Sequence, residues 1–212
     1  MLHLFILDKK RQELLPSIAN AGEGFYLAGG TALALQIGHR DSIDFDFFIE
    51  GNIDTLALWI KIQDIFSGYS LIKTQDELNT LSCIIDGDIR LSFFGYNYPL
   101  IQIPSNESDL KLASILDIGC MKLSAITSRA TLKDYVDLHF ILQQISLREL
   151  FEGMVKKFPT LDQGLVLKSL VYFDDILPEP ILFMPGFTVS LEEVKLSLIE
   201  HVKNYWNNTT VL

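Results

Sequence analysis

The sequence predicts an α/β protein in which a mixed sheet with flanking helices is followed by a helical lobe. Up to about Leu100, apolar residues recur in short strand-like runs, whereas from Leu116 onward they recur three or four apart, as on a helix face. The chain has 212 residues, 49% of them hydrophobic and 21% charged, which suffices for one compact globular body. We therefore expect a sheet-containing core over residues 1–110 and a helical C-terminal lobe over residues 111–212.

In the first half of the chain, helices and strands alternate. Apolar residues three or four apart predict helices, and short apolar runs predict strands. The helices are expected at Lys9–Ala21, Ala32–Gly38 and Asp54–Phe66, and the strands at Phe25–Ala28, Ile43–Ile49, Tyr69–Lys73, Leu81–Ile85 and Ile89–Tyr96. Asp86-Gly87 between the last two runs is typical of a tight β-hairpin.

Capping signals place the helices of the second half. Ser146 and Ser190 are each followed three residues later by a glutamate, which is the spacing of a capping box, so a helix should begin near each serine. Thr131 is the expected N-cap of a helix over Leu132–Gln144. A loop before the last helix is indicated by Pro178, Pro180, Pro185 and Gly186.

Charge and cysteine content narrow the classes of function. A net charge of -10 opposes a broad nucleic-acid footprint, so an RNA substrate would need a local docking patch. Cys83 and Cys120 have neither a disulfide framework nor a zinc-site spacing, and no apolar stretch could span a bilayer, so we expect a cytoplasmic protein. The second half contains a group of basic residues: Lys122, Arg129, Lys133, Arg148, Lys156 and Lys157. Such a group forms either a solvated helix face, which is the commoner case, or a binding patch.

Residues 25–49 read as a strand, a glycine turn, a helix and a second strand. Gly29 and Gly30 allow a tight turn and a close approach to a ligand, and the helix that follows presents unpaired N–H groups to phosphate. A glycine pair alone more often marks a simple turn. Thr31 either caps the helix or donates to an oxygen. Arg40 either meets a phosphate or pairs with a neighbouring aspartate, and we group it with Ser42 among the nucleotide-binding candidates.

Asp44 and Asp46 alternate with three apolar residues, Ile43, Phe45 and Phe47. Residues two apart on a strand share a face, so both carboxylates should project from one side, about 7 Å apart, while the apolar side chains enter the core. Such a pair repels unless cations neutralise it, and magnesium prefers oxygen ligands. An isolated Asp-x-Asp is more often an acidic solvent-facing strand, but the adjacent glycine turn favours two-metal phosphoryl transfer.

At these residues the sequence resembles the polymerase-beta-like nucleotidyltransferase superfamily, whose members carry a Gly-Gly or Gly-Ser turn, a short helix and an Asp-x-Asp strand. The segment LAGGTALALQIGHRDSIDFDFF resembles the AbiEii toxin family of two-gene abortive-infection and toxin-antitoxin systems, as does MKLSAITSRATLKDYVDLHFIL at residues 121–142. The resemblance implies the fold of that superfamily and transfer of a nucleoside monophosphate from an NTP to an acceptor, including RNA such as tRNA. It also implies Mg²⁺, as two ions, and a cognate antitoxin.

The second matching segment adds candidate catalytic residues. The resemblance implies that Lys122, Asp134 and Asp137 contribute to the active site together with the strand aspartates, and Lys133 also matches. From the residues alone, Lys122 either reaches inward to a triphosphate or extends along the surface. Asp134 and Asp137 either assist the acceptor hydroxyl or orient Lys122, or else Asp134 stabilises the helix start and Asp137 pairs with Lys133.

Ser92 departs from the superfamily pattern, which usually has a third carboxylate on a strand near the aspartate pair. A serine supplies no charge and is no strong base. Two hypotheses therefore stay open. The first is an active nucleotidyltransferase, in which Asp134 or Asp137 compensates or catalysis is slow. The second is a catalytically silent fold that binds nucleotide or a protein partner. A Rossmann-type cofactor site is disfavoured because the turn lacks the third spaced glycine.

Overall fold

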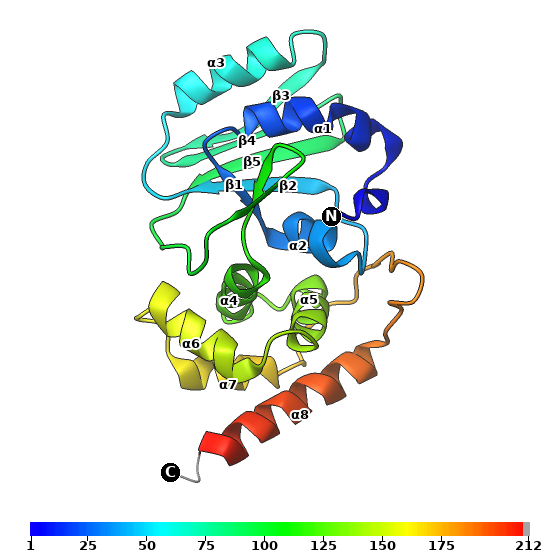
Figure 1. Ribbon diagram of the computed structural model, residues 1–212, viewed down its shortest axis with the longest axis vertical. Helices are drawn as coiled ribbons and strands as arrows, with labels where there is room; N and C mark the ends of the chain where they lie inside the picture. The colour runs from blue at the N-terminus through cyan, green and yellow to red at the C-terminus, as the bar shows by residue number, and fades with distance from the viewer. Residues whose placement is uncertain (210–212) are drawn as a thin grey trace. The chain divides into compact units, whose positions relative to one another are not determined.

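The computed structural model describes residues 1–209, which belong to two compact units. The first, Met1–Ser114, contains a sheet with helices, and the second, which begins at Ile115, is helical (Figure 1). The expected boundary at residue 110 falls at the start of β7 (Leu110–Leu112), and β7 pairs with β1 (Tyr26–Ala28). This pairing places the end of the first unit a few residues later.

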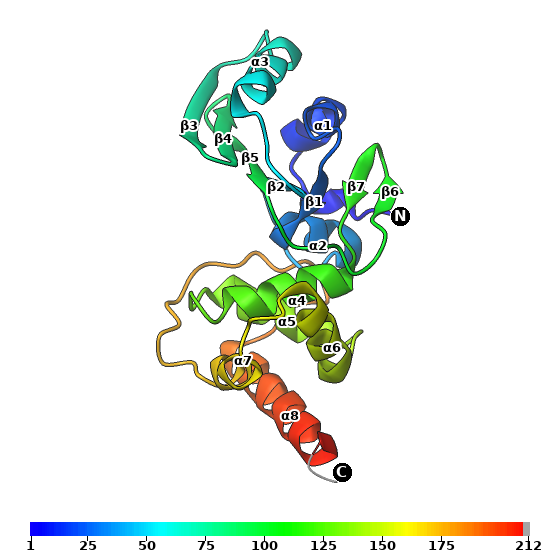
Figure 2. The ribbon, with the colours of Figure 1, turned by 90° about the vertical axis from the view of Figure 1, so that its left-hand side faces the viewer.

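Within the described residues, seven strands form one mixed sheet in the order β3-β4-β5-β2-β1-β7-β6. The remaining strands are β2 (Asp44–Ile49), β3 (Leu71–Glu77), β4 (Thr80–Ile85), β5 (Ile89–Gly95) and β6 (Ser105–Glu107). β2 runs parallel to β5 and antiparallel to β1. Figure 2 shows the β6–β7 hairpin at the edge of the sheet opposite β3. β2 is therefore an inner strand with a partner on each side.

The five predicted strands are confirmed, with shifts at their ends. The β4–β5 hairpin is also confirmed: Ile85 pairs with Ile89 across the three-residue loop 86–88, in which Asp86 and Gly87 have φ angles of 49° and 81°. β3 extends to Glu77, beyond the predicted end at Lys73. The three-residue strands β6 and β7 were not predicted.

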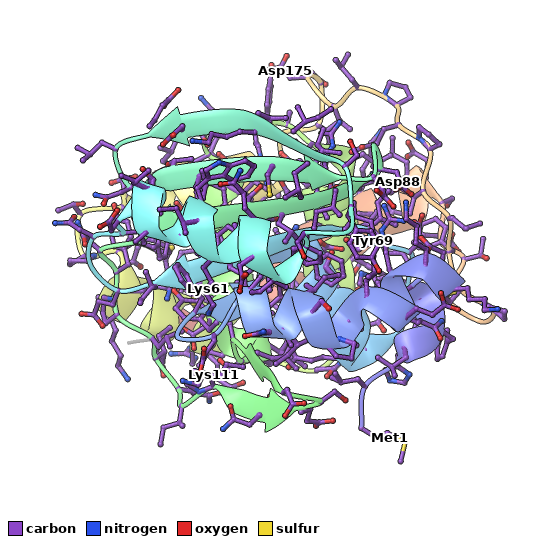
Figure 3. All side chains as sticks on the ribbon, turned by 90° about the horizontal axis from the view of Figure 1, so that it is seen from above. Met1, Lys61, Tyr69, Asp88, Lys111 and Asp175 are labelled. Atoms are coloured by element: carbon purple, nitrogen blue, oxygen red, sulfur yellow. The ribbon has the colours of Figure 1, made fainter. Side chains whose placement is uncertain are left out.

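The helices of the first unit are a short 3₁₀ helix (Leu4–Ile6), α1 (Lys9–Ala21), α2 (Gly29–Ile37) and α3 (Thr55–Ile65). α1 has the predicted bounds, whereas α2 begins three residues earlier than predicted, at Gly29, and ends where Gly38 adopts a φ of 69°. α1 and α3 lie over the same face of the sheet (Figures 1 and 3). Lys61 of α3, labelled in Figure 3, forms a 3.2 Å ion pair with Glu23, just after α1.

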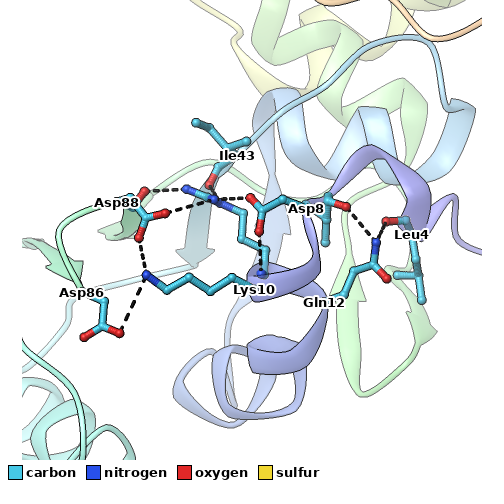
Figure 4. A network of polar contacts seen from close by, with 9 residues as sticks. Leu4, Asp8, Lys10, Gln12, Ile43, Asp86 and Asp88 are labelled. Atoms are coloured by element: carbon cyan, nitrogen blue, oxygen red, sulfur yellow. Dashed lines mark hydrogen bonds and ion pairs between the residues drawn. The ribbon is translucent and has the colours of Figure 1, made fainter.

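A buried arginine of α1 holds the starts of two neighbouring strands. Arg11, 3% exposed, donates from Nε to the main-chain oxygen of Ile43 at 3.1 Å and from Nη2 to that of Asp88 (Figure 4). Ile43 immediately precedes β2, and Asp88 immediately precedes β5. The arginine charge is balanced by Asp8, whose carboxyl pKa is lowered by bonds from Arg11 against the opposing effect of burial. Arg11 therefore fixes the parallel β2–β5 pair from one end.

The second unit packs five helices within the described residues: α4 (Ile115–Ala125), α5 (Leu132–Leu142), α6 (Leu147–Lys157), α7 (Gln163–Leu170) and α8 (Leu191–Thr209). Both predicted capping boxes are present, because Ser146 and Ser190 exchange bonds with Glu149 and Glu193. Thr131 occupies the N-cap position of α5, but its side chain makes no capping bond there. α7 was not predicted. In residues 1–209, no helix is both long and apolar enough to cross a membrane.

The second-half basic residues do not share one solvated face. Lys157 has no exposed surface, and its Nζ lies 3.0 Å from Oδ1 of Asp117, which is also fully buried. Lys122 is 7% exposed. The expectation of a single solvated helix face was wrong for these two lysines, because buried carboxylates replace the water that a surface amine would bind.

Two partly buried histidines should make the second unit sensitive to acid. Burial lowers the pKa of His139 on α5 below its ordinary 6.5, and nearby His201 on α8 adds to this shift, while burial also lowers the pKa of His201. Below about pH 6.5 the unfolded chain binds protons that the folded chain does not, so the free energy of unfolding should fall with falling pH. Urea titrations between pH 7.5 and 5 measure this. His139→Gln should flatten the profile, and a slope unchanged in that variant would contradict the assignment.

Candidate functional site

Asp44 and Asp46 project from one face of β2, as predicted. Phe45 and Phe47, which alternate with the two aspartates along β2, are 0% and 1% exposed. By contrast, Asp44 is exposed and Asp46 is partly buried. Ile43, which was expected to enter the core as a third apolar residue, is 43% exposed. The reason is that Ile43 lies before the first residue of β2, where the alternation of the strand has not begun.

Sheet register extends this face to the neighbouring strands. On parallel β5, Arg90 is the register partner of Asp44, and Ser92 is the register partner of Asp46. Ser92 in turn pairs with Ser82 on β4. Ser92 therefore lies beside Asp46, where the expected third carboxylate would be. A cavity of about 490 Å³ is lined by Arg90 and Ser92 together with Thr74, Gln75, Glu77, Ser82, Cys83 and Ile84.

The glycine bend lies directly against Asp46. Gly29 has a φ of 71°, and a Cβ built on it would lie 3.2 Å from Oδ2 of Asp46. A Cβ on Gly30 would lie 2.6 Å from Nη2 of Arg40 and 3.2 Å from Oγ of Ser42. Any larger residue at Gly30 would push these two side chains aside. The structure therefore brings the diglycine bend, one of the two strand carboxylates, Arg40 and Ser42 together.

Thr31 holds the start of β2 and does not cap α2. Its hydroxyl lies 2.8 Å from Oγ of Ser42 and bonds the main-chain oxygen of Asp44. The N-cap position belongs to Ala28, which has no side-chain oxygen to offer. Arg40, 3% exposed, donates from Nη1 to the main-chain oxygen of Asp41 at 2.7 Å. Of the two roles considered for Thr31, capping of α2 is not observed, and a bond from its hydroxyl to phosphate stays a prediction.

The donor set suits Mg²⁺ carried by a phosphate ligand. Within residues 1–209, no three His, Cys, Asp or Glu side chains lie where they could hold one metal ion together. Asp44 and Asp46 offer two carboxylates from one strand face, and Ser92 beside them is neutral. Mg²⁺ is commonly held by one or two carboxylates, with water and substrate phosphates completing its shell. The residues present fit such a shared site and not a cage built from protein alone.

The larger cavity of the first unit lies away from these carboxylates. It measures about 710 Å³ and is lined by Phe47 and by residues around Gly24 and Lys111. Successive side chains of a strand point to opposite faces, so Phe47 lies on the face opposite Asp46. We therefore place the candidate site on the carboxylate face, where the smaller cavity is lined by Arg90 and Ser92, the register partners of Asp44 and Asp46.

In the second unit, Lys122 lies between two buried aspartates. Its Nζ is 2.7 Å from Oδ1 of Asp134 and 2.6 Å from Oδ2 of Asp137, and these carboxylates are 1% and 0% exposed. Arg129 Nε adds a 2.8 Å contact to Asp134. We call these four residues the Lys122 cluster. Its role in catalysis stays a prediction.

The surface position considered for Lys122 and the pairing of Asp137 with Lys133 were both wrong, whereas Asp134 does lie in the first turn of α5. Lys122 is buried and does not extend along the surface. Lys133 pairs with Glu179 at 3.5 Å, whereas Asp137 contacts Lys122. Asp137 therefore orients Lys122, one of the two arrangements that the sequence left open.

Sequence reasoning missed Ser82 and Arg90 on the carboxylate face. The predicted hairpin between Leu81–Ile85 and Ile89–Tyr96 could have found Ser82, because a three-residue loop over 86–88 pairs Ile85 with Ile89 and hence Ser82 with Ser92. Arg90 has no such signal, since its place opposite Asp44 depends on a parallel pairing between distant strands.

Several known proteins are similar to this chain in sequence or in fold. A protein of Aquifex aeolicus described as uncharacterized is 37% identical over 210 residues, which are 95% of this chain and 98% of the relative. A putative nucleotidyltransferase from Helicobacter pylori shares the fold with a TM-score of 0.58 at 17% identity, over 93% of this chain and 95% of its own. The nucleotidyltransferase toxin MenT4 from Mycobacterium tuberculosis has a TM-score of 0.61 at 15% identity, over 91% of this chain and 82% of its own.

These likenesses confirm the polymerase-beta-like nucleotidyltransferase fold, a mixed sheet with flanking helices. The family match is broader than the two segments that first indicated it. Residues 14–198 match the family described as "Nucleotidyl transferase AbiEii toxin, Type IV TA system". The matched range contains the glycine bend, both strand aspartates and the Lys122 cluster. The chain belongs to the AbiEii family of nucleotidyltransferase toxins.

Proposed function

We propose that this protein transfers a nucleoside monophosphate from a magnesium-bound NTP to a hydroxyl of an RNA acceptor such as tRNA, with pyrophosphate as the leaving group. The observation that carries the proposal is the contact between the glycine bend and the acidic strand. Gly29 comes so close to Asp46 that a Cβ would lie 3.2 Å from its carboxylate oxygen. Phosphate bound at the bend and a cation bound by the strand would therefore be neighbours.

Each group on this face has a defined task in the proposal. Asp44 and Asp46 bind Mg²⁺, as two ions in the proposed form, which supplies positive charge to the phosphates and lowers the cost of pyrophosphate departure. Gly29 and Gly30 let the main chain approach the phosphates, and the amides at the start of α2 are oriented toward anions. Thr31 anchors the start of β2, so that the two carboxylates are held before substrate binds.

Arg40 and Ser42 complete the proposed nucleotide-binding group. Both side chains lie within van der Waals reach of Gly30, so a phosphate at the bend would meet a guanidinium and a hydroxyl. The Lys122 cluster is proposed to be required for full activity, on the basis of the family resemblance. A cytoplasmic location and a cognate antitoxin encoded beside the toxin also belong to the proposal, and they rest on the family.

A second candidate function is a silent nucleotidyltransferase fold that binds nucleotide without turnover. Ser92 favours it, because the residue beside Asp46 cannot act as a metal-binding carboxylate or as a strong base. The active form is better supported, since the bend, the carboxylate pair and the fold of an enzyme family occur together.

An acceptor screen tests the choice between these functions. Purified protein is incubated with Mg²⁺, each labelled NTP in turn, and total tRNA or other RNA pools. The active form predicts label in RNA and release of pyrophosphate with at least one NTP. NTP binding by calorimetry without pyrophosphate release across RNA and protein acceptors would instead establish the silent form.

A further inference from the structure

A row of aromatic rings continues the carboxylate face beyond Asp46. Phe48 follows Asp46 by two residues on β2, so the two side chains share a face. Phe94, the register partner of Phe48 on β5, stacks on it with ring centroids 5.0 Å apart. Tyr96 lies 5.2 Å from Phe48, and Tyr98 lies 4.9 Å from Tyr96. We call Phe48, Phe94, Tyr96 and Tyr98 the aromatic row.

The aromatic row differs from the rings of the hydrophobic core. Phe47 and Phe93, stacked on the opposite face of the same two strands, are 1% and 0% exposed. The rings of the aromatic row keep part of their surface in solvent, and Tyr98 is 41% exposed. Packing of the hydrophobic core therefore explains the stacked rings of Phe47 and Phe93. It does not explain why the partly exposed rings of the aromatic row lie beside two carboxylates.

Spacing along the strand matches the parts of a nucleotide. A strand rises about 3.3 Å per residue, so Phe48 lies roughly 7 Å along β2 from Asp46. In a nucleoside triphosphate the sugar separates the phosphates from the base by a comparable length. A triphosphate held by the bend and the carboxylates would therefore leave the near edge of its base level with Phe48, and the base would extend along the aromatic row toward the exposed ring of Tyr98.

We propose that the aromatic row, through its exposed end at Tyr98, stacks on the nucleobase of the NTP. The proposal rests on the proposed function for the position of the triphosphate. Every base offers a π-face, so stacking adds affinity with little base preference. Stacking on the aromatic row would then not distinguish one base from another, and we expect several NTPs to bind with similar dissociation constants.

The test compares ligands with and without a base. Calorimetry in Mg²⁺ gives the Kd of ATP and of inorganic triphosphate for the wild type, Tyr98→Leu and Tyr98→Phe. We expect Tyr98→Leu to weaken ATP binding about tenfold, within the range that a lost base stack produces, and to leave triphosphate binding unchanged. Tyr98→Phe keeps the ring and should bind like the wild type. Tyr69→Leu is the matched control, because Tyr69 is 42% exposed and lies outside the aromatic row.

Several outcomes would overturn the aromatic row as a base site: an unchanged ATP Kd in Tyr98→Leu, an equal loss for ATP and triphosphate, or no ATP binding by the wild type. Thermal melts of Tyr98→Leu confirm that it folds. The transfer assay separates this proposal from the proposed function. If the ATP Kd depends on the Tyr98 ring but no RNA is labelled, the base site stands and the proposed enzyme activity falls. If RNA is labelled equally well by the wild type and Tyr98→Leu, and the ATP Kd is also unchanged, the enzyme activity stands and the base site falls.

Discussion

Replacing Asp44 and Asp46 together by asparagine should lower nucleotidyl transfer by about a thousandfold or more. Asparagine keeps the size of each side chain but removes the two charges that attract Mg²⁺. Asp44 is exposed and Asp46 is partly buried, and neither fills the core of the sheet. We therefore expect the variant to fold, with a free energy of unfolding within about 1 kcal/mol of the wild type. Single-turnover transfer of label from the best NTP measures the loss.

A control separates the effect of this carboxylate pair from that of making the net charge less negative. Asp64→Asn removes an exposed carboxylate from α3 and should leave transfer unchanged. The two single variants, Asp44→Asn and Asp46→Asn, show whether each carboxylate is needed. If the double variant incorporates label at more than a tenth of the wild-type rate, Asp44 and Asp46 are not needed for transfer.

The parts of the candidate site that obey local rules could be predicted from the sequence. Alternation of Asp44, Phe45, Asp46 and Phe47 places the carboxylates on one face, because a strand has a period of two whatever its neighbours are. The hairpin at Asp86-Gly87 follows from turn chemistry in the same way. The capping boxes at Ser146 and Ser190 depend only on residues three apart, and both helices begin where expected.

Other parts depend on contacts between residues distant in sequence. β6 and β7 have three residues each, which is too short for a periodic signal. The hydroxyl of Thr31 bonds the main-chain oxygen of Asp44, thirteen residues away, a partner that no local pattern in the sequence indicates. Lys157 and Asp117 are forty residues apart, and nothing in the composition of their helices indicates that each would be buried against the other. Burial of a charge is set by tertiary packing.

Lys122→Met should destabilise the second unit by about 3 to 5 kcal/mol, the range for removing one member of a buried ion pair. Methionine fills a similar volume but leaves Asp137 fully buried without the amine 2.6 Å away. Asp134 keeps its contact with Arg129, which limits the loss. Denaturant titration measures the free energy of unfolding. Lys133→Met is the matched control, because Lys133 is 40% exposed at its side chain and its 3.5 Å pair with Glu179 should contribute about 1 kcal/mol at most.

Neutralising the whole cluster separates its stability role from a role in catalysis. In Lys122→Met with Asp134→Asn and Asp137→Asn, no buried carboxylate lacks a partner amine, so most of the lost stability should return. If the cluster contributes to transfer, as the family resemblance implies, this restored protein should bind NTP and still transfer label poorly. Restored stability accompanied by wild-type transfer would make the cluster purely structural. A triple variant as unstable as Lys122→Met would instead show that uncompensated charge is not what destabilises the single variant.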